Sequence, residues 1–340
     1  MTQKEKLDAR RKYLAQPVET VTGSPENPET CIQRFTDSGL YFRRFVCDSG
    51  RGGEPAEIVQ ITDVHLNGFD EIDARNGELM LTKQFRMWNR DEQSVKSLKK
   101  AMEFASLFDQ TVITGDTLDF LSHRAAVLMH RHIWDVDPTA LIALGGHEAV
   151  RQMQTGVRDA TSLESRYAQL EKWWNHDIYY VSRLVRDKAL CIVLDNGQGC
   201  YWERQIEPLK SDLALARREG YAVLIFQHEP VSTGREEDAV LRTFCRYDPE
   251  TIDCYNCVGR TSRRKENTAA TAEVYNLIIS NADIVKGIFV GHQHSAFYTE
   301  AEGYFTAPDG TRIPRRIPQP VLEGNPYNGH AGHVMRITVK

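Results

Sequence analysis

Two short polar clusters carry side chains of the types that bind metal ions. Asp63 and His65 are separated by one residue, and Asp116 and Asp119 by two. Each cluster follows an apolar, β-branched run, so its side chains are expected at the end of a buried strand. Carboxylate oxygens and imidazole nitrogens suit Mn, Fe or Zn. Taken singly, each cluster is also typical of a turn or a helix cap, where Asp is common.

Three later strand ends repeat this pattern with histidine. In each case an apolar run that reads as a buried strand is followed by polar residues. The histidines at these three ends are His147, then His228, then the pair His292 and His294. Five successive strand ends with Asp or His are difficult to explain as independent caps. The donors are numerous enough for two ions. Two ions about 3.5–4 Å apart can clamp both oxygens of an in-line phosphoryl displacement and acidify a bridging water.

Alternating strands and helices are predicted to position these side chains. Residues 57–62 and 111–114 read as strands, and residues 91–108 as the helix between them, with apolar residues spaced three, four and three apart. Such a strand–helix–strand unit connects parallel strands by a right-handed crossover. Asp63 and Asp116 are therefore expected at the same edge of neighbouring strands.

The later part of the chain continues this alternation. Residues 179–184 and 189–194 are predicted to form a hairpin, and a helix over 203–219 is predicted to end at Gly220. The tail, residues 297–340, is expected to form short antiparallel strands.

The remaining histidines are given structural interpretations. His123, His130 and His132 share a predicted helix and are interpreted as a solvated or core-edge face. His330 and His333 are interpreted as loop residues and not as a ligand set.

Composition is typical of a soluble globular protein. The 340 residues are 41% hydrophobic and 26% charged, which is ample for a large core. The net charge is -5, so no basic excess points to nucleic acid or to an anionic membrane. No apolar run reaches the roughly 20 residues that span a bilayer. Seven scattered cysteines and a charged first stretch without a hydrophobic leader lead us to expect a cytoplasmic protein with free thiols.

Taken in order, the motifs resemble those of the calcineurin-like metallophosphoesterase superfamily. They are Asp63-x-His65, Gly115-Asp116-x-x-Asp119, Gly145-Gly146-His147-Glu148, His228 and Gly291-His292-x-His294. Five motifs in this order and spacing are specific, and they extend from about residue 57 to residue 295. The resemblance implies an α/β fold of the metallophosphoesterase type, a sandwich of two mixed β-sheets flanked by helices.

The chain is accordingly divided into two parts. Residues 1–55 are predicted to be an N-terminal extension that packs on the core, and residues 56–340 to be the metallophosphoesterase domain. Residues 231–266 are charged and interrupt the alternation of strands and helices, so they are predicted to be an insertion. Cys254 and Cys257 within it could form half of a zinc site, but no second pair completes the set, and ordinary loop thiols are favoured.

The resemblance also implies the site residues and their roles. Two divalent or trivalent metal ions, Mn, Fe or Zn, are expected. Asp63, His65 and His294 would hold the first ion, His228 and His292 the second, and Asp116 would bridge both. His147 would stabilise the phosphoryl oxygens or protonate the leaving group. Asp119 would orient His147 by accepting its ring N–H.

One position departs from the family pattern. The family normally has Asn before the histidine of its Gly-Asn-His motif, and the amide oxygen of that Asn binds the second metal. This chain has Gly146 there, which offers no side chain. We expect the affinity for the second metal to be lowered as a result.

The function that the resemblance implies is hydrolysis of a phosphoester. A metal-bound hydroxide would attack phosphorus, and the expected substrate is a small phosphorylated metabolite or nucleotide, with no membrane partner and nucleic acid disfavoured by the acidic balance. The alternatives are a nuclease of the same superfamily, a non-catalytic scaffold with an impaired second metal site, and a metal-dependent hydrolase that acts on something other than phosphate.

Overall fold

The fold is described from a computed structural model. The description covers the whole chain except residues 1, 76–90, 150–161, 232–267, 295 and 325–331. The predicted insertion and its three cysteines, Cys245, Cys254 and Cys257, therefore lie outside the described residues, apart from Val231, which opens it.

One sheet has seven strands and carries the first three site motifs. In spatial order its strands are β1 (Val18–Thr22), β2 (Ile32–Phe35), β3 (Tyr41–Cys47), β13 (His333–Val339), β4 (Ala56–Ile61), β5 (Gln110–Thr114) and β6 (Leu141–Ala143). Strands β4, β5 and β6 are parallel, as predicted for the crossover unit. Strand β13, the last strand of the tail, is antiparallel to β4 but parallel to β3. The prediction of antiparallel strands in the tail is therefore wrong for the pairing of β13 with β3.

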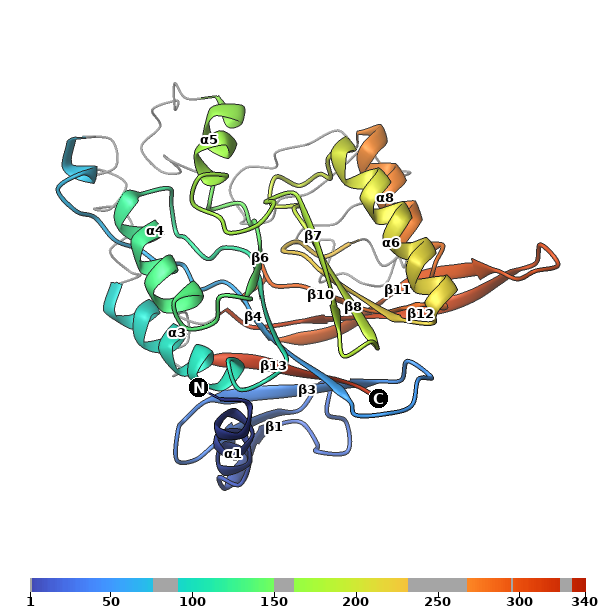
Figure 1. Cartoon of the computed structure of the whole chain (residues 1–340), viewed down its shortest axis with the longest axis horizontal. Helices are drawn as coiled ribbons and strands as arrows, with labels where there is room; N and C mark the ends of the chain where they lie inside the picture. Colours follow the sequence, from blue (N-terminus) through green and yellow to red (C-terminus); the bar gives the residue numbers. More distant parts are fainter. Residues whose placement is uncertain (1, 76–90, 150–161, 232–267, 295, 325–331) are drawn as a thin grey trace.

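A second sheet has four strands and carries the last two motifs. Its strands, in spatial order, are β10 (Val285–Phe289), β9 (Ala222–Phe226), β8 (Ala189–Leu194) and β7 (Tyr180–Val185). Strands β8, β9 and β10 are parallel, and β7 and β8 form the predicted hairpin. Strands β11 (Phe297–Thr306) and β12 (Arg312–Val321) pair separately as a ribbon that projects from the body (Figure 1).

The two sheets pack face to face over an apolar core. Ile58, Val112 and Leu141 of the first sheet are fully buried in one cluster with Leu224 and Phe289 of the second. Burial of a side chain of this size stabilises the fold by about 1.5–3 kcal/mol. Because each sheet contains parallel and antiparallel pairs, the architecture is the predicted sandwich of two mixed sheets.

Helices cover the outer faces of both sheets (Figure 1). The first sheet is covered by α3 (Asp91–Ala105) and α4 (His123–Met129), and the second by α6 (Ile206–Glu219) and α8 (Ala269–Ile279). Two further helices are α1 (Gln3–Leu14) and α5 (Leu163–Leu170). Helix α6 ends at Gly220 with φ 74°, the left-handed cap that its sequence predicts. The helix predicted to carry His123, His130 and His132 is divided, because α4 ends at Met129 and the chain continues as a π-helical turn over His130–Trp134.

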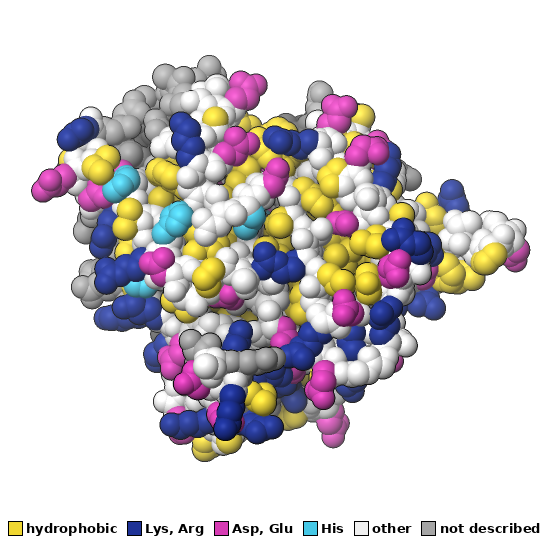
Figure 2. All heavy atoms as spheres, in the orientation of Figure 1, with side chains coloured by type: hydrophobic (Ala, Val, Ile, Leu, Met, Phe, Trp, Pro, Cys, Tyr) yellow, Lys and Arg dark blue, Asp and Glu magenta, His cyan; other side chains and the backbone are white. Residues whose placement is uncertain are grey.

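The surface mixes charges of both signs. Figure 2 shows Lys and Arg interspersed with Asp and Glu on the face that it presents. Among the described helices, none combines the length and the apolar character that a bilayer crossing requires.

Candidate metal centre

The predicted site residues converge from both sheets. They follow β4, β5 and β6 in the first sheet and β9 and β10 in the second. Their ligand atoms form three overlapping groups, each lying within 4.8 Å, with members Asp63, His65, Asp116, Asp119, His147, His228, His292 and His294. Strand ends that are far apart in sequence therefore deliver one compact set of carboxylates and imidazoles.

The first group, called the four-donor group below, consists of Asp63, His65, Asp116 and His294. Nε2 of His294 lies 3.2 Å from Oδ1 of Asp63 and 3.3 Å from Nε2 of His65. Nε2 of His65 lies 3.7 Å from Oδ2 of Asp116. Ring nitrogens and carboxylate oxygens that face a common point at such distances are arranged as ligands of one cation.

The second group, called the three-donor group below, consists of Asp116, His228 and His292. Nε2 of His228 lies 3.2 Å from Oδ2 of Asp116 and 3.1 Å from Nδ1 of His292. Oδ2 of Asp116 faces both groups, which is the position required of a bridging carboxylate.

His147 stands beside the shared carboxylate. Its Nδ1 lies 3.0 Å from the carbonyl oxygen of Asp119 and 3.2 Å from Oδ1 of the same residue. Since a carbonyl oxygen only accepts, Nδ1 carries the proton and Nε2 faces Oδ2 of Asp116 at 3.8 Å. Oδ1 of Asp119 also lies 3.3 Å from Nδ1 of His65, a contact that the sequence did not suggest.

In Asp63 and Asp116, one carboxylate oxygen accepts hydrogen bonds from neighbouring groups and the other faces the candidate metal centre. Oδ2 of Asp63 accepts hydrogen bonds from the hydroxyl of Thr62 at 2.6 Å and from the backbone N–H of His292 at 2.9 Å. Oδ1 of Asp116 accepts from the backbone N–H of His147 at 3.0 Å. The other oxygen of each is thereby aimed at the ring nitrogens. Hydrogen bonds that fix ligands in this way are typical of metal sites.

The imidazole of His228 is fixed by the neighbouring sheet. Its Nδ1 donates to the carbonyl oxygen of Thr114 at 2.9 Å. This bond fixes the orientation of the ring, so Nε2 is the nitrogen that faces the three-donor group.

The backbone at the ligand positions is unusual. Asp63, His65, Asp116, His292 and His294 have φ between 47° and 70°, in the left-handed region that residues with a Cβ rarely adopt. Such conformations cluster at functional sites, where the surrounding structure maintains them. Here the bends turn consecutive polar side chains toward one point.

Glycines allow the loops to approach the ligands. A Cβ at Gly145 would overlap Oδ1 of Asp116, and one at Gly291 would overlap Oδ2 of Asp63. A Cβ at Gly146 would meet only the carbonyl oxygen of Gly197, at 3.2 Å. Gly145 and Gly291 are therefore required by packing, while a side chain at Gly146 needs only a small shift.

The electrostatics favour cation binding. Burial opposes ionisation of Asp63 and Asp116, but the histidines that face them hold the pKa of both carboxyls well below the ordinary value. Burial, together with His228, lowers the pKa of His292 to about 3. His228 itself is buried but faces Asp116, and its pKa is raised well above the ordinary value. Ionised carboxylates together with imidazoles are the donor set of a binuclear metal site. The residues present here fit such a site.

Glu148 is a buried residue whose role the sequence did not reveal. Its carboxylate accepts hydrogen bonds from the backbone N–H groups of Thr117, Leu118 and Gly145. It therefore ties the loop after β5 to the loop after β6. Its place directly after His147 was the available signal.

Other polar clusters lie apart from the centre. Nδ1 of His123 is 2.6 Å from Asp70, and Nε2 of His130 is 2.6 Å from the carbonyl oxygen of Trp173. His333 is buried at the start of β13, with Nδ1 3.5 Å from Glu323, so its interpretation as a loop residue is wrong.

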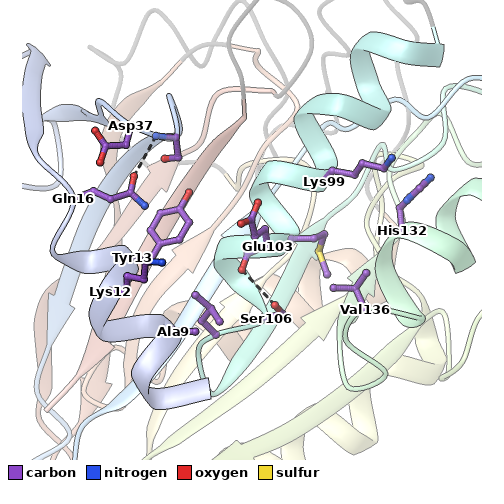
Figure 3. Close-up of a pocket in the computed structure, with 13 residues that line it drawn as sticks. Ala9, Lys12, Tyr13, Gln16, Asp37, Lys99, Glu103, Ser106, His132 and Val136 are labelled. Carbon is purple, nitrogen blue, oxygen red and sulfur yellow. Dashed lines mark hydrogen bonds between the residues drawn. The ribbon is translucent and has the colours of Figure 1, made fainter. Parts of the chain in front are cut away.

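A cavity of about 670 Å³ lies between α1 and α3 (Figure 3). Tyr13, Lys99, Glu103 and His132 are among its lining residues, and none of the site residues is. This cavity is therefore separate from the candidate metal centre.

No protein-family model and no curated protein matches this chain. A dimetal phosphatase from Danio rerio is 16% identical over 80% of this chain and 89% of its own, with a TM-score of 0.43. A purple acid phosphatase from yellow lupin seeds (Lupinus luteus) is 14% identical over 83% of this chain and 46% of its own, with a TM-score of 0.44. A calcineurin-like phosphoesterase from Bacillus subtilis is 13% identical over 72% of this chain and 73% of its own, with a TM-score of 0.28. The chain is thus similar to solved structures named dimetal phosphatase, purple acid phosphatase and calcineurin-like phosphoesterase.

Proposed function

We propose that this chain is a metal-dependent phosphoester hydrolase. The observation that carries the proposal is the pair of donor groups that share Oδ2 of Asp116, with His147 beside them. When bound, two metal ions at such a site neutralise phosphoryl oxygens and acidify a water molecule.

The residues of the chain have separable tasks in this proposal. Asp63, His65 and His294 hold the first ion, His228 and His292 hold the second, and Asp116 holds both. Asp119 accepts a hydrogen bond from Nδ1–H of His147 and thereby keeps Nε2 directed into the site. In its doubly protonated form, an imidazole held in this way can donate the Nε2 proton to the oxygen of the leaving group and become neutral, or stabilise the charge on the phosphoryl oxygens.

The substrate that we favour is a small phosphorylated metabolite or nucleotide. The net charge of -5 gives no excess of basic residues for a long polyanion, and on the face that Figure 2 presents Lys and Arg are interspersed with Asp and Glu. A nuclease activity would instead appear as degradation of single-stranded DNA at low salt.

The test is hydrolysis of p-nitrophenyl phosphate and bis-p-nitrophenyl phosphate by protein purified without chelator. We expect activity on at least one ester, its loss on chelation, and its return on addition of Mn²⁺. The H147A variant should lose about 10²–10⁴-fold in turnover with metal content unchanged, because only proton transfer and charge stabilisation are removed.

The matched control is H123A, since His123 pairs with Asp70 away from the centre. It should keep wild-type turnover. Unchanged hydrolysis in H147A would overturn the role given to His147. Metal-loaded wild-type protein that cleaves neither ester nor DNA would overturn the proposed function.

A further inference from the structure

A buried glutamine links the two sheets directly below the metal centre. Gln60 lies in β4, three residues before Asp63, and is fully buried. Its Nε2 donates to Oγ1 of Thr114 at 2.9 Å and to the carbonyl oxygen of Val290 at 3.1 Å. Thr114 ends β5 in the same sheet, whereas Val290 follows β10 in the other sheet. One amide therefore joins both halves of the sandwich.

The residues that Gln60 contacts lead directly into the ligand loops. Val290 is followed by Gly291 and His292, and Thr114 by Gly115 and Asp116. The carbonyl oxygen of Thr114 also accepts the ring N–H of His228 at 2.9 Å. A shift at either end of the Gln60 link would therefore move ligands of the second metal relative to the bridging carboxylate.

Both donor groups depend on the spacing between the sheets at this edge. The four-donor group combines Asp63 of the first sheet with His294 of the second. The three-donor group combines Asp116 of the first sheet with His228 and His292 of the second. Metal ligands must keep their distances to within a few tenths of an ångström, so the spacing between the sheets decides how well either ion binds.

Apolar packing alone would not require an amide at this position. The inter-sheet core around it is apolar, and Oε1 of Gln60 accepts no hydrogen bond from the described residues. A buried polar atom without a partner is unfavourable, and a Met of similar volume would avoid that cost. What the amide adds is its pair of donor bonds, one to each sheet.

We propose that Gln60 is a positioning residue that sets the spacing between the two halves of the metal centre. It contacts no ligand side chain among the described hydrogen bonds, and it acts through Thr114 and Val290. The inference rests on the metal centre that the proposed function requires, but not on the reaction performed there.

The experiment compares Mn²⁺ binding in the full-length Q60M and Q110M variants by equilibrium dialysis. Gln110 is the matched control, because it is also buried but lies at the other end of β5, where its Nε2 donates to the carbonyl oxygens of Thr111 and Thr139. We expect Q60M to bind Mn²⁺ about 10- to 100-fold more weakly, the range found when outer partners of metal ligands are removed, and Q110M to bind as wild type does. The electron paramagnetic resonance signal of the coupled Mn²⁺ pair should change in Q60M only.

If Q60M folds poorly, a second variant tests the same hydrogen-bond link. T114V removes one acceptor of the Gln60 amide and keeps the side-chain shape, so it should weaken Mn²⁺ binding in the same direction by a smaller factor. Equal Mn²⁺ affinity and an unchanged spectrum in Q60M and Q110M would overturn the inference. Absence of ester hydrolysis by wild-type protein that binds two Mn²⁺ would instead overturn the proposed function alone.

Discussion

The two donor groups of the candidate metal centre are built from similar residues but are not equally complete. The four-donor group takes two carboxylates and two imidazoles, whereas the three-donor group takes one carboxylate, which it shares, and two imidazoles. Four protein ligands complete a tetrahedral site, while three leave a position open for water or substrate. In the proposed function, the first ion would therefore be held by protein ligands alone, and the second would keep an open position.

The cause of the difference is a single position. Gly146 stands where the superfamily that the motifs resemble has an Asn, the expected extra donor to the second metal. A Cβ at Gly146 would meet the carbonyl oxygen of Gly197 at 3.2 Å. We therefore expect the four-donor group to fill at lower metal concentration than the three-donor group.

The largest effect is expected from removal of the residue that both groups share. D116A should weaken both sites by more than the roughly 100-fold that loss of an outer partner costs, because a ligand itself is lost. Elemental mass spectrometry should then find less than one metal equivalent per chain, and hydrolysis should be abolished. Retention of two equivalents would mean that Asp116 is not the bridge.

The next test removes one imidazole from each group. H292A leaves the three-donor group with two protein ligands, so the protein should retain one metal equivalent after dialysis. H294A leaves the four-donor group with three, so the two sites should become similar in affinity. Each loss is expected to be about 100-fold or more at the affected site, since a ligand is removed. Identical metal titrations of the two variants would contradict the inequality of the groups.

The smallest effect should come from restoring the missing donor. G146N is expected to raise the affinity of the second site by about 10-fold, at the low end of the effect of a single partner on metal binding. Calorimetric titration with Mn²⁺ should show two binding steps of similar affinity in G146N, whereas the wild type should show two steps of unequal affinity. Because the new Cβ has to displace the Gly197 carbonyl slightly, G146A serves as the control for strain alone. No difference between G146N and G146A would sink this explanation.

Local patterns made much of this structure predictable. Strand β5 and the helix α3 before it follow from apolar periodicity, and their crossover places Asp63 and Asp116 on neighbouring parallel strands, as expected. The strand pattern did not indicate that His228, His292 and His294, which follow strands of the other sheet, would join them; that expectation came from the resemblance of the motifs. Their roles as ligands stay predictions until metal binding is measured.

What could not be predicted depends on contacts between distant segments. Nothing near β13 indicates that it pairs with β3 on one side and β4 on the other, since both partners lie far away in sequence. The cross-sheet link of Gln60 is similarly invisible, because an isolated Gln in a strand pattern has no local signature. The π-helical turn after α4 could not be read either, since its sequence is compatible with a continuing helix.

The position of β13 has a consequence for the order in which the molecule folds. It fills the gap between β3 and β4, so pairing along this part of the sheet joins segments from opposite ends of the sequence. Such non-local pairing carries a large loop-closure entropy and is slow. Until it forms, β3 and β4 each present an open edge that can pair with another chain. Capture of β13 is therefore expected to be a late step, and the interval before it to be the period in which newly made chains are most prone to aggregate.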